Sequence, residues 1–284
     1  MLKTNSHTHL CDLCGYHLHP LLPEENPGGW LRCSRKVCAL LQRSHFHPEK
    51  PLPITFEDKL EPDSLWDRIK ETFTNRSDDK ERWKTLYLPE NPGLLLDIGT
   101  GDIHPVLNAA ARGWNTHIIH TNSLLIEKHN QSNQIQISHT PPIWEEYAST
   151  PFDAIIIRWY LEQVPYPSQL LRSAWNSLIP GGRLIIFAWN ASSYGHELYG
   201  KNWLPLHIPQ FKYIFTASSL RQCLYAAGIK CRYNLFCSSA GQLPQSNPPA
   251  INQDEHELHK KIAHILKEEP MSGEALILTC NKHK

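Results

Sequence analysis

The sequence lacks long hydrophobic runs and has no excess of charge of either sign. No stretch approaches the roughly 18 uninterrupted apolar residues of a membrane-spanning helix, and the first residues have no apolar signal core. Lysine plus arginine total 28, as do aspartate plus glutamate, so the formal net charge is zero. We therefore expect a cytoplasmic protein without a membrane span, and the charge balance disfavours nucleic acid as a partner.

Cysteine is present but unevenly distributed. Two residues separate Cys11 from Cys14, and four residues separate Cys33 from Cys38. Without a signal core, this crowding favours a metal site over disulfides. Four thiolates can surround Zn²⁺ tetrahedrally at about 2.3 Å, so we predict that these four cysteines bind zinc. The neighbouring histidines that could replace a ligand are His7, His9, His17 and His19.

Proline divides the chain into a short module and a long one. Prolines at positions 48, 51, 53 and 62 indicate a linker. We predict a zinc ribbon over residues 1–46, a proline-rich linker over 47–62 and a second domain over 63–284. A segment as short as the first one cannot form a hydrophobic core of its own, which further favours a metal there.

Apolar segments alternate with helical patterns from residue 93 onward. The expected strands are 94–99, 116–120, 135–138, 152–159, 183–189, 233–239 and 274–280. The expected helices are 106–113, 123–131, 167–178, 218–228 and 254–269, with a turn over Pro180–Gly182. Near-continuous hydrophobic strands in this alternation predict an α/β fold, with a parallel sheet covered on both faces.

An aspartate and two glycines end the first of these strands. Gly99 and Gly101 allow a sharp turn and a close approach of the backbone to a ligand, while Asp97 can accept loop amides or meet a cationic group. A pyrophosphate-binding loop would have a third glycine where this sequence has His104, and the lysine of a triphosphate-binding loop is missing as well. Dinucleotides and nucleoside triphosphates therefore fit poorly.

An ordered set of motifs follows further along the chain, at Phe152–Asp153, Leu161–Val164 and Leu178–Gly182. This set resembles the fourth and fifth strand region of class I S-adenosylmethionine (SAM)-dependent methyltransferases. The segment over 199–229 is similar to the ubiquinone-type O-methyltransferase subgroup, and the resemblance covers residues 65–237. It implies a Rossmann-like seven-stranded sheet, mostly parallel with an antiparallel last strand, and methyl transfer from SAM.

The resemblance also implies which residues bind the cofactor. The implied residues are Asp97, Gly99, Thr100, Gly101, His120, Arg158 and Trp159. In the family a carboxylate binds both ribose hydroxyls, whereas His120 in that place can make only one such hydrogen bond. The loss of a bond to a charged group would weaken binding by about 1.5–3 kcal/mol.

Methylation of a hydroxyl or an amine requires that the acceptor lose a proton. The histidines that usually serve the subgroup are replaced here by Gln163 and Phe211. We predict His207, Glu162 and His196 as catalytic residues, because they fall in segments expected to face the acceptor. The predicted acceptor is a small molecule or a peptide-linked group, methylated on oxygen or nitrogen.

Two alternatives stay open. The replaced ribose carboxylate and histidines are also compatible with a non-catalytic binding or scaffold protein of the same fold. A similar four-ligand module precedes some ribosomal RNA methyltransferases. However, residues 1–60 contain seven Lys/Arg against six Asp/Glu, a weak electrostatic match for a phosphate backbone.

Overall fold

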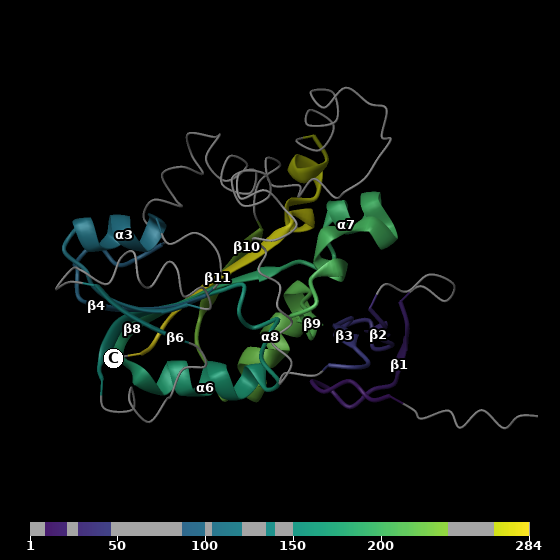
Figure 1. Ribbon diagram of the computed structural model, residues 1–284, viewed down its shortest axis with the longest axis horizontal. Helices are drawn as coiled ribbons and strands as arrows, with labels where there is room; N and C mark the ends of the chain where they lie inside the picture. The colour runs from purple at the N-terminus through teal and green to yellow at the C-terminus, as the bar shows by residue number, and fades with distance from the viewer. Residues whose placement is uncertain are drawn as a thin grey trace, which may run out of the picture.

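A computed structural model of the chain describes residues 9–21, 28–46, 87–99, 104–120, 135–139, 150–237 and 264–283, without the side chains of 104, 120 and 135–139. The described part contains a seven-stranded and a four-stranded sheet (Figure 1). None of its helices has the length and hydrophobicity needed to cross a membrane.

The larger sheet has the strand order β10-β11-β8-β7-β4-β5-β6. Its strands are β4 (Leu94–Gly99), β5 (Asn115–His120), β6 (Ile135–His139), β7 (Phe152–Arg158), β8 (Leu178–Trp189), β10 (Tyr233–Cys237) and β11 (Ala275–Asn281). The pairs from β6 through β8 are parallel, and β11 runs antiparallel to both neighbours. The predicted α/β fold with a Rossmann-like mixed sheet is confirmed.

Three of the predicted helices are present, and local sequence explains how they begin or end. α6 (Pro167–Ser177) begins with proline, whose missing N–H would have no partner in a first turn anyway. α8 (Ala217–Ala226) is capped by the side chain of Thr216, which accepts a hydrogen bond from the third helical amide. Gly228, with φ of +80°, ends the turn after α8. α3 (His104–Ala111) covers the other face of the sheet (Figure 1).

The sequence of strand β7 is hydrophobic without alternation because both faces of the strand are buried. Ile155 and Ile157 are fully buried on the face that packs against α6 and α8, and Ile156 is fully buried on the face that packs against α3. Each such side chain stabilises the fold by roughly 1.5–3 kcal/mol relative to an exposed one. Helices on both faces therefore require consecutive apolar residues.

The turn predicted over Pro180–Gly182 is not a separate element, because these residues lie inside β8. Phe152 pairs with Leu178, whereas Ala154 pairs with Arg183, so the triplet bulges out of the β7–β8 ladder. A Cβ atom on Gly182 would lie 3.0 Å from the Ile179 carbonyl oxygen, which explains the glycine.

Two of the predicted helices fall wholly or partly outside the described residues. The helix expected over 123–131 lies outside them, and of the helix expected over 254–269 only 264–268 is described, as helix. A short 3-10 helix, η4 (Pro270–Ser272), then precedes β11.

The smaller sheet joins the N-terminal strands to a strand of the second predicted domain. Three of its strands, β1 (Leu18–Pro20), β2 (Trp30–Cys33) and β3 (Leu41–Arg43), belong to the predicted ribbon. The fourth, β9 (Tyr213–Ile214), precedes α8 and pairs antiparallel with β3. The ribbon sheet is thus completed by a strand from the second predicted domain, while the predicted linker over 47–62 lies outside the described residues.

A cover segment, residues 190–212, connects β8 to β9. It contains α7 (Tyr194–Tyr199) and two 3-10 helices, η1 (Gly200–Asn202) and η2 (Leu204–His207). The ribbon packs against it, since the Trp30 indole N–H donates to the Leu206 carbonyl at 2.9 Å.

Candidate active site

The order of strands reverses direction at β4. β5 and β6 extend from one side of this strand, and β7 and β8 extend from the other. In open parallel sheets, ligands bind at the carboxyl ends of the strands at such a point. Gly99 ends β4 and pairs with Arg158, which ends β7, so two of the predicted cofactor residues lie there.

Glycine at position 99 is required by the neighbouring strand. A Cβ atom there would lie 2.9 Å from the main-chain oxygen of Arg158 and 3.0 Å from its Cβ atom. Any side chain would push β4 and β7 apart. The other predicted loop residues, Thr100 and Gly101, lie outside the described residues, as does the side chain of His120 at the end of β5.

Asp97 and Arg158 form a buried ion pair at this point. The Arg158 Nε atom donates to Asp97 Oδ1 at 2.7 Å, and Nη2 donates to Oδ2 at 2.6 Å. The side chains are 0% and 1% exposed. Two parallel charge-assisted bonds fix both groups in one geometry. The sequence places both residues near the cofactor but does not predict that they bind each other.

Trp159 has a strained backbone immediately after β7. Its φ is +53°, in the left-handed region that a bulky residue seldom adopts. Its main-chain oxygen accepts a bond from Gln163 Nε2 at 2.7 Å, and its ring lies 5.2 Å from the ring of Trp189. Strained residues held by their surroundings cluster at functional sites, so this backbone supports a site at the carboxyl end of β7.

Glu162 is a fully buried carboxyl group in the loop that follows β7. Its Oε1 atom accepts a bond from the Trp189 amide at 2.6 Å, while Oε2 has no partner among the described residues. Burial raises the pKa of Glu162 to about 8, and the Trp189 amide opposes this only in part. The group is therefore mainly a neutral acid at pH 7.

The other two predicted catalytic residues lie on different elements from Glu162. His196 in α7 bonds through Nδ1 to the Ala191 oxygen at 2.7 Å and stacks on the ring of Trp203 at 4.5 Å. Burial lowers the pKa of His196. His207 in η2 is exposed, and its Nε2 lies 2.8 Å from the Lys201 oxygen. The three side chains thus bond to three separate main-chain groups.

The four predicted zinc ligands are brought together by the ribbon strands. The sulfur atoms of Cys11, Cys14, Cys33 and Cys38 all lie within 4.8 Å of one another. Sγ of Cys14 is 3.5 Å from that of Cys33, and Sγ of Cys11 is 3.9 Å from that of Cys38. Tetrahedral zinc with bonds of about 2.3 Å would separate its sulfurs by about 3.8 Å, so the spacing fits. Within the described residues, no histidine belongs to this cluster.

Within the cluster, the pKa of Cys11 is shifted towards thiolate, the form of cysteine that binds metal, whereas the pKa values of Cys33 and Cys38 are raised. The hydrogen bond with Cys38 lowers the pKa of Cys11 to about 5, although burial opposes it. Burial is also the main reason that the pKa of Cys33 rises to about 11. A cation would favour ionisation of all four thiols, because metal ligation and deprotonation are linked.

A family model described as a methyltransferase domain matches residues 74–234, more than half of the 284 residues. This chain belongs to the methyltransferase family. It is an enzyme with a class I methyltransferase fold, in agreement with the strand order and the motifs.

Solved structures similar to the methyltransferase support the fold. One is a SAM-dependent methyltransferase from Archaeoglobus fulgidus, with 15% identity over 75% of this chain and 97% of that one and a TM-score of 0.51. Another is the methyltransferase solved in complex with the Haloferax volcanii activator Trm112, with 14% identity, coverage of 77% and 98%, and a TM-score of 0.50. No curated protein matches the methyltransferase in sequence.

Sequence reasoning missed a second buried carboxyl group in the methyltransferase. Glu274, just before β11, accepts bonds from the Gly195 amide at 2.8 Å and from the Trp203 indole N–H at 2.9 Å. Burial raises the pKa of Glu274 to about 7, and these donors oppose the rise. These two bonds tie α7 and Trp203, the residue before η2, to the sheet. The sequence around Glu274 indicates only the start of a strand. No local pattern could therefore have predicted that this carboxyl group is buried and bonded to α7 and Trp203.

Proposed function

We propose that the methyltransferase transfers a methyl group from SAM to a small-molecule or peptide-linked acceptor, on oxygen or nitrogen. The observation that carries the proposal is the Asp97–Arg158 pair at the carboxyl ends of β4 and β7. The methionine part of SAM has an ammonium and a carboxylate group. The pair is buried and its two bonds are made within the protein, so it fixes the carboxyl ends of β4 and β7, the place in a parallel sheet where such a ligand binds.

Cofactor binding can be tested directly by calorimetry with S-adenosylhomocysteine. We expect a dissociation constant in the micromolar range, weakened relative to a site with a ribose carboxylate because His120 replaces it. Heat of binding that stays absent at millimolar ligand would favour the scaffold alternative.

The charges of the ribbon support a small or peptide-linked acceptor over RNA. The Arg43 guanidinium is buried and donates to the Leu206 and Pro209 oxygens at 3.1 and 3.0 Å. Lys212 of the cover segment pairs with Asp12 of the ribbon at 2.7 Å. These cations are used within the protein, which leaves fewer for phosphates. The motif resemblance favours the ubiquinone-type O-methyltransferase subgroup.

Among the predicted catalytic residues, we propose Glu162 as the group that takes up the acceptor's proton. A base must be ionised to accept a proton, and with a pKa raised by burial to about 8, Glu162 is ionised in a minor fraction of molecules at pH 7 and in most of them above pH 8. Its Oε2 atom is buried without a partner among the described residues, so it is the carboxyl oxygen left to take up a proton. His196 and His207 stay alternative candidates.

The aromatic rings of Trp159, Trp189 and Trp203 form consecutive contacts and pack the cover segment.

We further propose that the ribbon over residues 1–46 binds zinc, in a chain whose second domain spans 63–284. The eight cysteines are all free thiols, in keeping with the cytoplasm that we propose as its location. Purified protein is expected to contain about one zinc per chain, and Cys11→Ser is expected to lose it, because a structural site needs all four ligands.

Cys231→Ser is the matched control for this prediction, since Cys231 lies outside the four-cysteine cluster. Metal content well below one zinc per chain in the wild type, with a Cys11→Ser variant of equal stability, would contradict the ribbon.

A further inference from the structure

We infer that the ribbon is a structural part of the acceptor side of the enzyme, in which Asp12 and Tyr213 act as positioning residues for Glu162 and zinc loading maintains their contacts. This inference rests on the proposed zinc site and on the proposed function of Glu162. The sequence prediction gave only a ribbon over 1–46 and a second domain over 63–284 separated by a linker, without contacts between them.

The first step is the shared sheet. β3 of the ribbon pairs with β9, with Leu41 opposite Ile214 and Gln42 opposite Tyr213. Beyond β9, the Phe215 oxygen accepts a bond from the Ala191 amide at 2.6 Å. A continuous path of main-chain bonds therefore connects the ribbon to the residues that follow β8.

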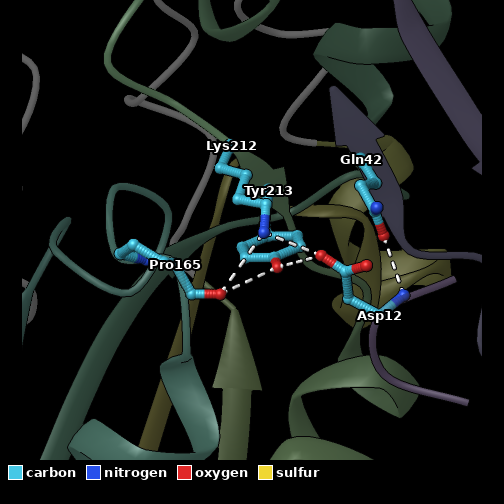
Figure 2. A network of polar contacts seen from close by, with 5 residues as sticks. All are labelled: Asp12, Gln42, Pro165, Lys212 and Tyr213. Carbon is cyan, nitrogen blue, oxygen red and sulfur yellow. Dashed lines mark hydrogen bonds and ion pairs between the residues drawn. The ribbon is translucent and has the colours of Figure 1, made fainter. Parts of the chain in front are cut away.

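The second step is a polar network that begins between two zinc ligands. Asp12 lies between Cys11 and Cys14, and Figure 2 shows its carboxylate pointing at Tyr213 and Lys212. The Tyr213 hydroxyl donates to Asp12 Oδ2 at 2.6 Å, and Lys212 Nζ lies 2.7 Å from the same atom. The Asp12 amide donates to Gln42 Oε1 at 3.0 Å, which holds the loop from Cys11 to Cys14 against β3.

The other half of the cluster makes a similar contact. The Thr216 hydroxyl donates to the main-chain oxygen of Cys38 at 2.7 Å. Gln222 in α8 donates to the oxygen of Val37 at 2.6 Å. Both pairs of proposed ligands are therefore bonded to the segment from β9 to α8, through Asp12 in the loop over 11–14 and through Val37 and Cys38 in the loop over 33–38.

The third step leads to Glu162. The amides of Lys212 and Tyr213 both donate to the Glu162 main-chain oxygen, at 2.7 and 3.1 Å. The Tyr213 hydroxyl also lies 3.1 Å from the oxygen of Pro165, the residue that ends this loop (Figure 2). The two residues that Asp12 holds by their side chains thus hold the loop over 162–165 by their main chain.

Zinc matters for this path because the ribbon strands are only three or four residues long. Such strands cannot hold the loop from Cys11 to Cys14 in place without a metal that joins them. When the metal leaves, Asp12 loses its fixed position, and the Lys212 and Tyr213 side chains lose their common partner.

Hydrogen exchange on the full chain tests this inference. With zinc bound, Tyr213→Phe and Asp12→Asn are expected to accelerate exchange of the Lys212 and Tyr213 amides by about tenfold or more, because a bond to a charged group is lost. Removal of zinc from the wild type with EDTA is expected to do the same. Amides of β4 and β5 should be unaffected in the variants. Tyr225→Phe, at a tyrosine that is 74% exposed in α8, is the matched control.

A second measurement separates positioning from a general loss of structure. The titration of the Glu162 carboxyl group, followed by carbon NMR, is expected to shift its midpoint in Tyr213→Phe but not in Tyr225→Phe. Tyr213→Phe changes no ribbon residue, so it decides the outcome even where zinc loss unfolds the chain or Asp12→Asn loses metal.

The inference is wrong if zinc removal accelerates exchange only within residues 9–46, or if Tyr213→Phe leaves both the Lys212 amide and the Glu162 titration as in the wild type. Calorimetry with S-adenosylhomocysteine on the same samples keeps the two proposals apart. Absence of cofactor binding would contradict the proposed function but would not change the expected hydrogen-exchange result.

Discussion

Replacement of Arg158 by methionine is expected to lower the free energy of unfolding by about 3–5 kcal/mol, because it leaves the Asp97 carboxylate buried without its main counter-charge. Both side chains are almost completely inaccessible, at 1% and 0% exposure, so water cannot replace the lost guanidinium. Urea unfolding at neutral pH measures the effect.

The double variant with Asp97→Asn and Arg158→Met is expected to recover part of this loss, since it removes both charges. Arg221→Met, on the exposed side of α8, is the matched control and should change stability by no more than about 0.5 kcal/mol. A loss in Arg158→Met no larger than that of the control would contradict a strong buried pair. Equal losses in the single and double variants would mean that the guanidinium acts through packing instead of charge.

Replacement of Glu162 by glutamine is expected to change both stability and catalysis, in opposite directions. The pKa of Glu162 rises from 4.5 in the unfolded chain to about 8 in the folded protein. A carboxyl group with a raised pKa stabilises the fold fully below pH 4.5, and that contribution is lost as the pH rises through about 8. Glutamine does not titrate and keeps an oxygen for the Trp189 amide.

The variant should therefore gain stability relative to the wild type as the pH rises over this window. The gain should reach the order of 5 kcal/mol above it. Its methyl-transfer rate should fall by about 100-fold, as expected when a general base is lost. Thermal unfolding and turnover, measured across pH, test both effects.

Glu197→Gln, at an exposed position of α7, controls for the loss of one negative charge. A stability difference that does not vary with pH would contradict the raised pKa. Full activity in Glu162→Gln would instead direct attention to His196 or His207 as the base.

The amino-acid pattern alone was sufficient to predict the elements of the sheet. The consecutive isoleucines of β7 indicate a strand covered on both faces, and the structure has helices on both faces. The spacing of the cysteines similarly predicts a four-sulfur cluster, because short loops bring Cys11 to Cys14 and Cys33 to Cys38. These features are local, since burial and loop closure depend on residues close in sequence.

The partners of the buried charges depended on the tertiary structure. Asp97 and Arg158 are 61 residues apart and meet only because β4 and β7 are neighbours in the sheet. Glu274 reaches Trp203 across 71 residues, and Tyr213 reaches Asp12 across 201. Strand order and the packing of the ribbon decide these pairs. Neither the periodicity of hydrophobic residues nor the spacing of motifs predicts which strands are neighbours in the sheet.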